Sequence, residues 1–120
     1  MHIDNSINLT ELAKMIGDDK DFIREILCDF QHELEDLTKK IINGFEKGDI
    51  DCLQQHVHNL RGISGSVCAT ELHAVLNSID EAVRCRNMSL ANSFLSTFLS
   101  SKNAAADFLS EFLNDESKLS

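Results

Sequence analysis

The hydrophobic positions of the chain recur every three or four residues, as they do on one face of an α-helix. The longest stripe consists of Ile23, Ile26, Leu27, Phe30, Leu34, Leu37, Ile41 and Phe45. Asp18 and Asp19 precede it and suit the N-terminus of a helix, where acidic groups are stabilising. Gly48 ends the pattern and Asp49 is placed to cap the next helix. These features predict one helix of roughly seven turns between the two aspartates and Gly48.

Four other stripes indicate further helices, over residues 9–16, 49–67, 72–83 and 90–112. Gly17 ends the first, which is too short to be stable alone. Only short segments remain as connections, such as residues 87–89. Four long helices with short connections pack most simply as an antiparallel up-down-up-down bundle. We therefore expect an all-α single domain over residues 1–120, with a short N-terminal cap helix and a polar tail at about 115–120.

The composition agrees with this fold class and limits the function. The 120 residues include no proline and only five glycines, which leaves few places for strand turns. The formal net charge is −9, whereas binding to a phosphate backbone needs a basic stripe. Most of that charge lies in residues 1–51, so the second half repels anions less. Nucleic acid is therefore not expected as a partner.

The termini and cysteines point to a cytoplasmic protein. Residues 1–6 are polar and lack the apolar core of a signal peptide, and no apolar stretch has the length of a membrane span. The four cysteines form no CxxC pair and are too sparse for a disulfide scaffold, so we interpret them as reduced core thiols. They are Cys28, Cys52, Cys68 and Cys85.

One flank of the predicted helix over residues 49–67 has an unusual composition. With Val57 toward the core, this flank carries Gln54, His58, Arg61, Gly62 and Gly65. Each glycine costs a helix about 1 kcal/mol relative to alanine. Their absent side chains leave space beside a half-exposed imidazole, and an arginine is suited to phosphoryl oxygens. A neutral imidazole is nucleophilic, so the flank has the parts of a surface phosphohistidine site. Close packing of a neighbouring helix is the alternative reason for small residues here.

Residues 58–72 resemble the signature of histidine phosphotransfer (HPt) domains, roughly H-x-L-[KR]-G-[SA]-[SA]-x-x-[ILV]-G-A-x-x-L. The matching positions are His58, Leu60, Arg61, Gly62, Ser64, Val67, Ala69 and Leu72. Ile63 replaces a small residue and Cys68 replaces the glycine at the end of the helix. The resemblance covers the whole chain, because HPt domains are four-helix bundles with a short N-terminal helix and a Gly-Asp pair before the histidine helix, here Gly48-Asp49.

The resemblance implies that His58 accepts a phosphoryl group from the aspartyl phosphate of one response-regulator receiver domain. His58 would then pass the group to the aspartate of another receiver through Nε2. Arg61 would neutralise phosphoryl charge, and Gly62 would let the receiver and its Mg²⁺ approach. The chain itself would need no cofactor. A hybrid sensor histidine kinase is a further partner, and a monomer is expected.

Additional contacts to a receiver are expected around this site. The polar candidates are Gln54, Gln55, Arg84 and Arg86, and Gly65 is a further candidate on the same flank as His58. A docking surface commonly carries a small apolar patch within a polar rim. Apolar candidates for such a patch are Leu12, Met15, Ile16 and Ile63, although they are equally suited to seal the end of the bundle.

Three alternatives come from other classes of protein. A helical adaptor, or pseudo-HPt protein, would bind the same partner without taking phosphate. A metal protein is a weaker candidate, because Cys52 and His56 share a helix face but no other ligand is required by spacing to join them. A kinase is not expected, since neither GxxxxGK[ST] nor GxGxxG occurs. The sequence thus indicates a phosphocarrier rather than an enzyme with its own ATP site.

Overall fold

The computed structural model describes residues 6–119, with side chains described as far as residue 114. This part of the chain is helical and contains no strand. The helices are α1 (Leu9–Ile16), α2 (Lys20–Lys47), α3 (Ile50–Ser66), α4 (Thr70–Arg84), α5 (Met88–Ser93) and α6 (Leu95–Leu119).

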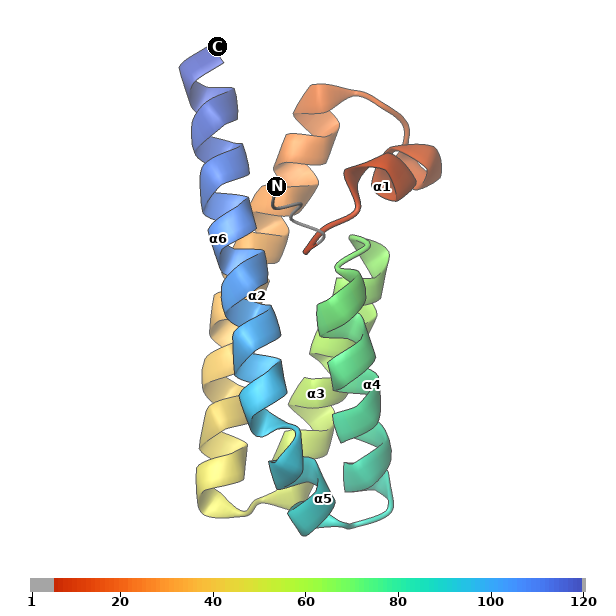
Figure 1. Ribbon diagram of the computed structural model, residues 1–120, viewed down its shortest axis with the longest axis vertical. Helices are drawn as coiled ribbons and strands as arrows, with labels where there is room; N and C mark the ends of the chain where they lie inside the picture. The colour runs from red at the N-terminus through yellow and green to blue at the C-terminus, as the bar shows by residue number, and fades with distance from the viewer. Residues whose placement is uncertain (1–5, 120) are drawn as a thin grey trace.

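The four long helices form an antiparallel bundle (Figure 1). Helix α3 packs mainly between α2 and α4, and α6 closes the bundle by packing against α4 and α2. Helix α1 lies across one end, beside the connection between α3 and α4, whereas α5 lies at the opposite end (Figure 1). The predicted fold class and the cap helix are therefore confirmed.

Short polar contacts define where the helices begin and end. The Asp49 carboxylate accepts a hydrogen bond from the backbone N–H of Cys52 at 3.1 Å, which caps α3. Gly48 before it has φ +63°, the left-handed conformation that favours glycine at the end of α2. At the other end of α3, the backbone N–H of Asn8 donates to the carbonyl of Cys68 at 2.9 Å. This last bond ties the start of α1 to the end of α3.

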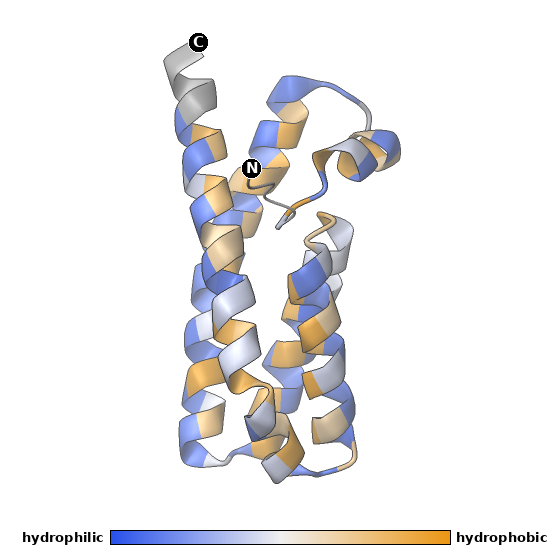
Figure 2. Cartoon of the chain, viewed as in Figure 1, coloured by the Kyte–Doolittle hydropathy of each residue, from blue (hydrophilic) through white to orange (hydrophobic). Residues whose placement is uncertain are grey.

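The core lies along the bundle axis and includes buried apolar residues from each helix. Hydrophobic and hydrophilic residues alternate along the long helices (Figure 2). One glycine is needed there for close helix packing. A Cβ added to Gly44 of α2 would lie 3.3 Å from both the Cα and the Cβ of Leu53 in α3. Gly44 therefore allows the two helix backbones to approach each other near the Gly48 turn.

The predicted helix over residues 90–112 is wrong as a single helix, because the chain turns at Phe94 between α5 and α6. The Phe94 N–H bonds to the carbonyl of Ala91, one residue closer than in an α-helix, and this tightens the chain locally. Ala91 is buried as a result, and Leu90, expected on the core stripe, is 46% exposed. Helix α5 also begins at Met88, because Asn87 caps it.

The structure also bears on the predictions for the ends of the chain, the cysteines and membrane spans. The expected polar tail continues α6 as far as Leu119, while Ser120 and residues 1–5 lie outside the described residues. All four cysteines are free, but Cys85 is exposed and the others are only partly buried, so the interpretation as core thiols is wrong. Within residues 6–119, no helix combines the length and the apolarity that a membrane span requires.

Replacing Gly44 with alanine tests the close approach of α2 and α3. Alanine gains about 1 kcal/mol in helix propensity, but overpacking against a neighbouring backbone costs typically about 1–3 kcal/mol. We expect Gly44→Ala to lower the free energy of unfolding in urea by about 1 kcal/mol. Gly62→Ala is the control, because a Cβ at Gly62 meets nothing within 4 Å and should raise stability. Equal stability of the two variants would contradict the packing argument.

Candidate functional site

His58 lies on the outer side of α3 with its side chain 63% exposed. Its neighbours Val57 and Leu60 are fully buried against the core, which fixes the rotation of the helix. The Nδ1 atom of the imidazole faces α4, 3.9 Å from Oδ2 of Asp80. This arrangement leaves Nε2 as the ring nitrogen that faces away from Asp80.

Asp80 is a buried carboxylate beneath the imidazole, with its side chain only 3% exposed. Its Oδ1 has no hydrogen-bond partner among the described residues. Three positively charged or ionisable groups surround the other oxygen, Oδ2: His58, Arg61 Nε at 3.6 Å and Arg84 Nε at 3.8 Å. These distances are too long for hydrogen bonds, so the contacts are electrostatic. Asp80 therefore gathers the cationic groups of α3 and α4 around one point.

The two arginines differ in how firmly they are held. Arg61 is 32% exposed, and its Nη1 donates a hydrogen bond of 3.0 Å to Oδ1 of Asn77. Arg84 is 63% exposed, and Asp80 is its ion-pair partner within the described part of the chain. Arg61 is thus fixed along α4 by two contacts, whereas Arg84 can reorient toward a bound group.

The two glycines of the predicted flank have different surroundings. A Cβ added at Gly62 would meet nothing within 4 Å, so the surface there is open. A Cβ added at Gly65 would lie 3.0 Å from the ring of His73. His73 Nδ1 donates a 2.9 Å hydrogen bond to the Arg61 carbonyl, which can only accept. The expectation that Gly65 opens the surface is wrong, because Gly65 makes room for this link between α4 and α3.

A cavity of about 360 Å³ opens beside the imidazole. Its lining residues are Gln54, Gln55, His58, Asn59, Asp80 and Arg84. The structure thus brings Gln54, Gln55 and Arg84 to the same hollow as His58, as the sequence analysis expected for contacts around the site. Arg86 lies elsewhere, with its Nη1 3.4 Å from Oδ1 of Asp51.

The apolar residues expected on a docking patch are only partly exposed. Leu12 is fully buried, and its expected place on the surface is wrong because it points from α1 into the core. Met15 is 61% exposed, while Ile16 and Ile63 are partly buried. Of these four candidates, only Met15 is exposed.

Cys68 replaces the glycine that ends the histidine helix in the signature. Its φ of +60° is the left-handed conformation that glycine adopts without strain. The helix ends at the expected place despite this substitution, with the Cys68 N–H bonded to the carbonyl of Gly65. Burial, and to a lesser extent the Glu11 carboxylate, raises the pKa of the Cys68 thiol. The thiol therefore remains largely protonated at neutral pH.

Sequence reasoning missed Asp80, Asn77 and His73, all on α4. A signal was present for Asp80, which follows Leu76 by four residues and precedes Val83 by three. Such a position faces the core, and a carboxylate there needs a charged partner. No comparable sequence signal marked Asn77 or His73, because their contacts depend on how α4 is rotated against α3.

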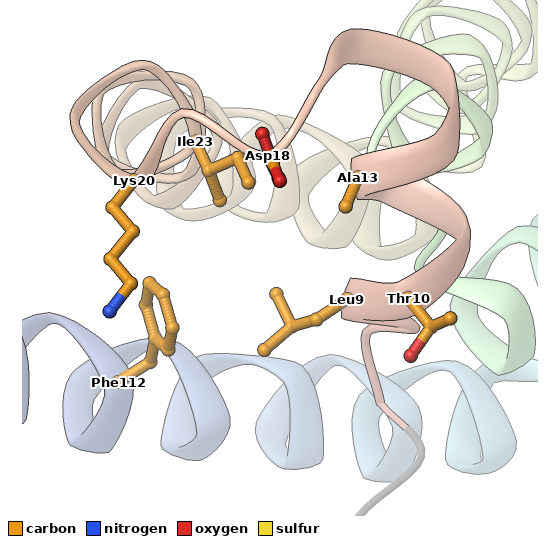
Figure 3. A pocket seen from close by; sticks show the side chains of 7 residues that line it. All are labelled: Leu9, Thr10, Ala13, Asp18, Lys20, Ile23 and Phe112. Carbon is orange, nitrogen blue, oxygen red and sulfur yellow. The ribbon is translucent and has the colours of Figure 1, made fainter.

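Another hollow of the described structure lies away from His58. It measures about 440 Å³ and lies between α1, the start of α2 and α6 (Figure 3). Its walls are mainly apolar, with Ile23 and Phe112 on facing sides (Figure 3). Asp18 and Lys20 are its charged lining residues, and none of the lining residues belongs to α3 or α4. It therefore adds no group to the site around His58.

The metal alternative gains no support from ligand geometry. Within the described residues, no group of three or more histidine, cysteine, aspartate or glutamate side chains is placed to hold a metal ion. Cys52 and His56 are both partly buried on α3.

Comparison with known proteins identifies the family of the chain. The family model described as Hpt domain matches residues 25–114, which include all of α3 and α4. No curated protein and no solved structure matches the chain significantly. The matched region holds the exposed histidine, the two arginines and the open glycine. The chain therefore belongs to the Hpt domain family, whose members are phosphocarrier modules with a phosphotransfer role in two-component signalling.

Proposed function

We propose that this chain is a phosphorelay intermediate in which His58 carries the phosphoryl group. In this proposal the group comes from the aspartyl phosphate of one receiver domain and goes to the aspartate of another. The observation that carries the proposal is the exposed imidazole of His58 beside a buried carboxylate that two arginines also approach, next to an open helix surface.

The position of Asp80 supports Nε2 as the reacting atom. A carboxylate near Nδ1 stabilises the neutral imidazole tautomer that carries its proton on Nδ1. The lone pair then lies on Nε2, which faces away from Asp80. An exposed nitrogen lone pair is what attack on a phosphorus atom requires.

The bonds, charges and protons of the transfer step can be accounted for with the groups of the site and the receiver's aspartate. The Nε2 lone pair of His58 forms an N–P bond while the P–O bond to the receiver's aspartate breaks, and that aspartate leaves as a carboxylate. The imidazole ring becomes positively charged because its Nδ1 proton remains in place. Asp80 stabilises this charge from 3.9 Å, as a buried carboxylate stabilises an imidazolium in other histidine chemistry. The reverse sequence of bonds delivers the group to the second receiver.

The arginines supply positive charge for the phosphoryl oxygens. Arg61 and Arg84 approach Asp80 from α3 and α4, so both lie close to His58. Guanidinium groups bind phosphoryl oxygens in bidentate geometry and stabilise charge in phosphoryl transfer. Arg84 is the more exposed of the two and is therefore the better placed to reach a group bound at Nε2.

A receiver domain would approach over Gly62, where no side chain blocks the surface. The Mg²⁺ ion would belong to the receiver, where it neutralises phosphoryl charge. The sequence contains no phosphate-binding loop for ATP, so the chain is proposed as a carrier that is loaded by another protein.

Labelled phosphate transfer tests the site directly. A receiver domain loaded with ³²P should label the wild-type chain and leave His58→Gln without label, because glutamine has no nucleophilic ring nitrogen. His32→Gln is the matched control, since His32 is exposed on α2, and it should be labelled like the wild type. Label that persists on His58→Gln would contradict the assignment of the phosphorylated residue. A receiver that binds the wild type without labelling it would favour the adaptor alternative.

Replacing Gly62 with glutamine tests the open surface. The fold should be at least as stable, since glutamine is a better helix former by about 0.5–1 kcal/mol. Transfer from the receiver should nevertheless slow about tenfold or more, because small displacements of reacting groups are costly. Gly62→Ala should slow it less. Unchanged transfer in a stably folded Gly62→Gln variant would show that clearance at Gly62 has no role.

A further inference from the structure

A further hollow, separate from the two described above, runs between α2 and α3. Its volume is about 460 Å³. Ile26 and Phe30 of α2 form its apolar surface together with Ile63 of α3 and Val67, which directly follows α3. Asp29 and Glu33 of α2 also line it, and both are exposed. We refer to this hollow as the acidic groove.

The acidic groove adjoins the open position at Gly62 through two of its lining residues, Ile63 and Ser66. Ile63 follows Gly62 directly, and the hydroxyl of Ser66, which also lines the groove, donates a 3.0 Å hydrogen bond to the Gly62 carbonyl. A protein that docks over Gly62 therefore comes within reach of the groove. The arginines Arg61 and Arg84 pair with Asp80 on α4 instead. The surface around the site is thus cationic toward α4 and acidic toward α2.

The charge of the groove is not neutralised within the described chain. The segment 21–36 holds six acidic side chains against one basic residue, Arg24. Two of these acids have partners, since Glu35 pairs with Lys102 at 3.0 Å and Asp36 pairs with Lys40 at 3.2 Å. Asp29 and Glu33 have no ion-pair partner among the residues that the structure describes.

The spacing of the two unpaired acids defines what would pair with them. Asp29 and Glu33 are four residues apart on α2, so their Cβ atoms are about 5–6 Å apart on one helix face. Two cations one helical turn apart on a partner would match that separation. The apolar part of the groove between α2 and α3 would accept one apolar side chain located between those cations.

We propose that the acidic groove selects the receiver partners of this chain. The preferred receiver presents a helix with an apolar side chain between two lysine or arginine residues one turn apart. This inference rests on the proposed function, because the receiver reaches the groove by docking over Gly62. Charged groups at such an interface chiefly govern association rate and partner choice. Asp29 and Glu33 are therefore specificity residues, and they take no part in the chemistry at His58.

A charge-reversal experiment tests the proposal. The probe is a ³²P-loaded receiver domain that labels the wild-type chain, and the readout is the second-order rate of transfer at low and high salt. The test variant is Asp29→Lys/Glu33→Lys. The control is Asp107→Lys/Glu111→Lys, because these two acids are also exposed and four residues apart, but lie on α6. Thermal unfolding of both variants establishes that each is folded.

The acidic-groove variant should transfer at least about tenfold more slowly at low salt, and the difference should shrink at about 0.5 M salt, where charges are screened. The α6 variant should stay within about twofold of the wild type. A receiver whose two matching lysine or arginine residues are changed to glutamate should restore the rate of transfer to the Asp29→Lys/Glu33→Lys variant. Equal rates for the two charge-reversed chains would overturn the proposal while His58 labelling still stands. Absence of label on the wild type with every receiver would instead refute the proposed function.

Discussion

The site depends on one buried charge, the carboxylate of Asp80. A buried carboxylate is costly unless opposite charges compensate it, and Oδ1 of Asp80 has no hydrogen bond within the described residues. The compensating charges are those of Arg61 and Arg84, and the imidazole of His58 lies beside the same oxygen, with all three groups within 4 Å of Oδ2. The same contacts orient the imidazole and hold two cations beside it. Asp80 therefore links the electrostatics of the bundle interior to the chemistry proposed at its surface.

The antiparallel register of α3 and α4 places Asp80 under the histidine. Three pairs of residues cross between the helices in one register: Gly65 with His73, Arg61 with Asn77, and His58 with Asp80. The first pair is a close steric contact, the second a hydrogen bond and the third an electrostatic contact. A shift of α4 by one turn would separate all three. Gly65 thus contributes to the site indirectly, by allowing the packing that sets this register.

The fold was largely predictable because long amphipathic stripes and helix caps are local features of the sequence. The placement of His58, Arg61 and Gly62 on one helix was predictable for the same reason. Tertiary contacts were not predictable in this way: Asp80 joins the site only through the rotation of α4. The burial of Leu12 depends on how α1 docks, and the turn at Phe94 depends on packing of α5 and α6 at the end of the bundle.

The state of the His58 ring gives the most direct test of this account. Nitrogen-15 chemical shifts of the imidazole at neutral pH report which ring nitrogen carries the proton. The account predicts that the neutral ring of the wild-type chain is protonated at Nδ1, and that Asp80→Ala removes this preference. A neutral ring protonated mainly at Nε2, equally in the wild type and in Asp80→Ala, would contradict the role of Asp80 and leave Nε2 without the lone pair that phosphoryl transfer needs.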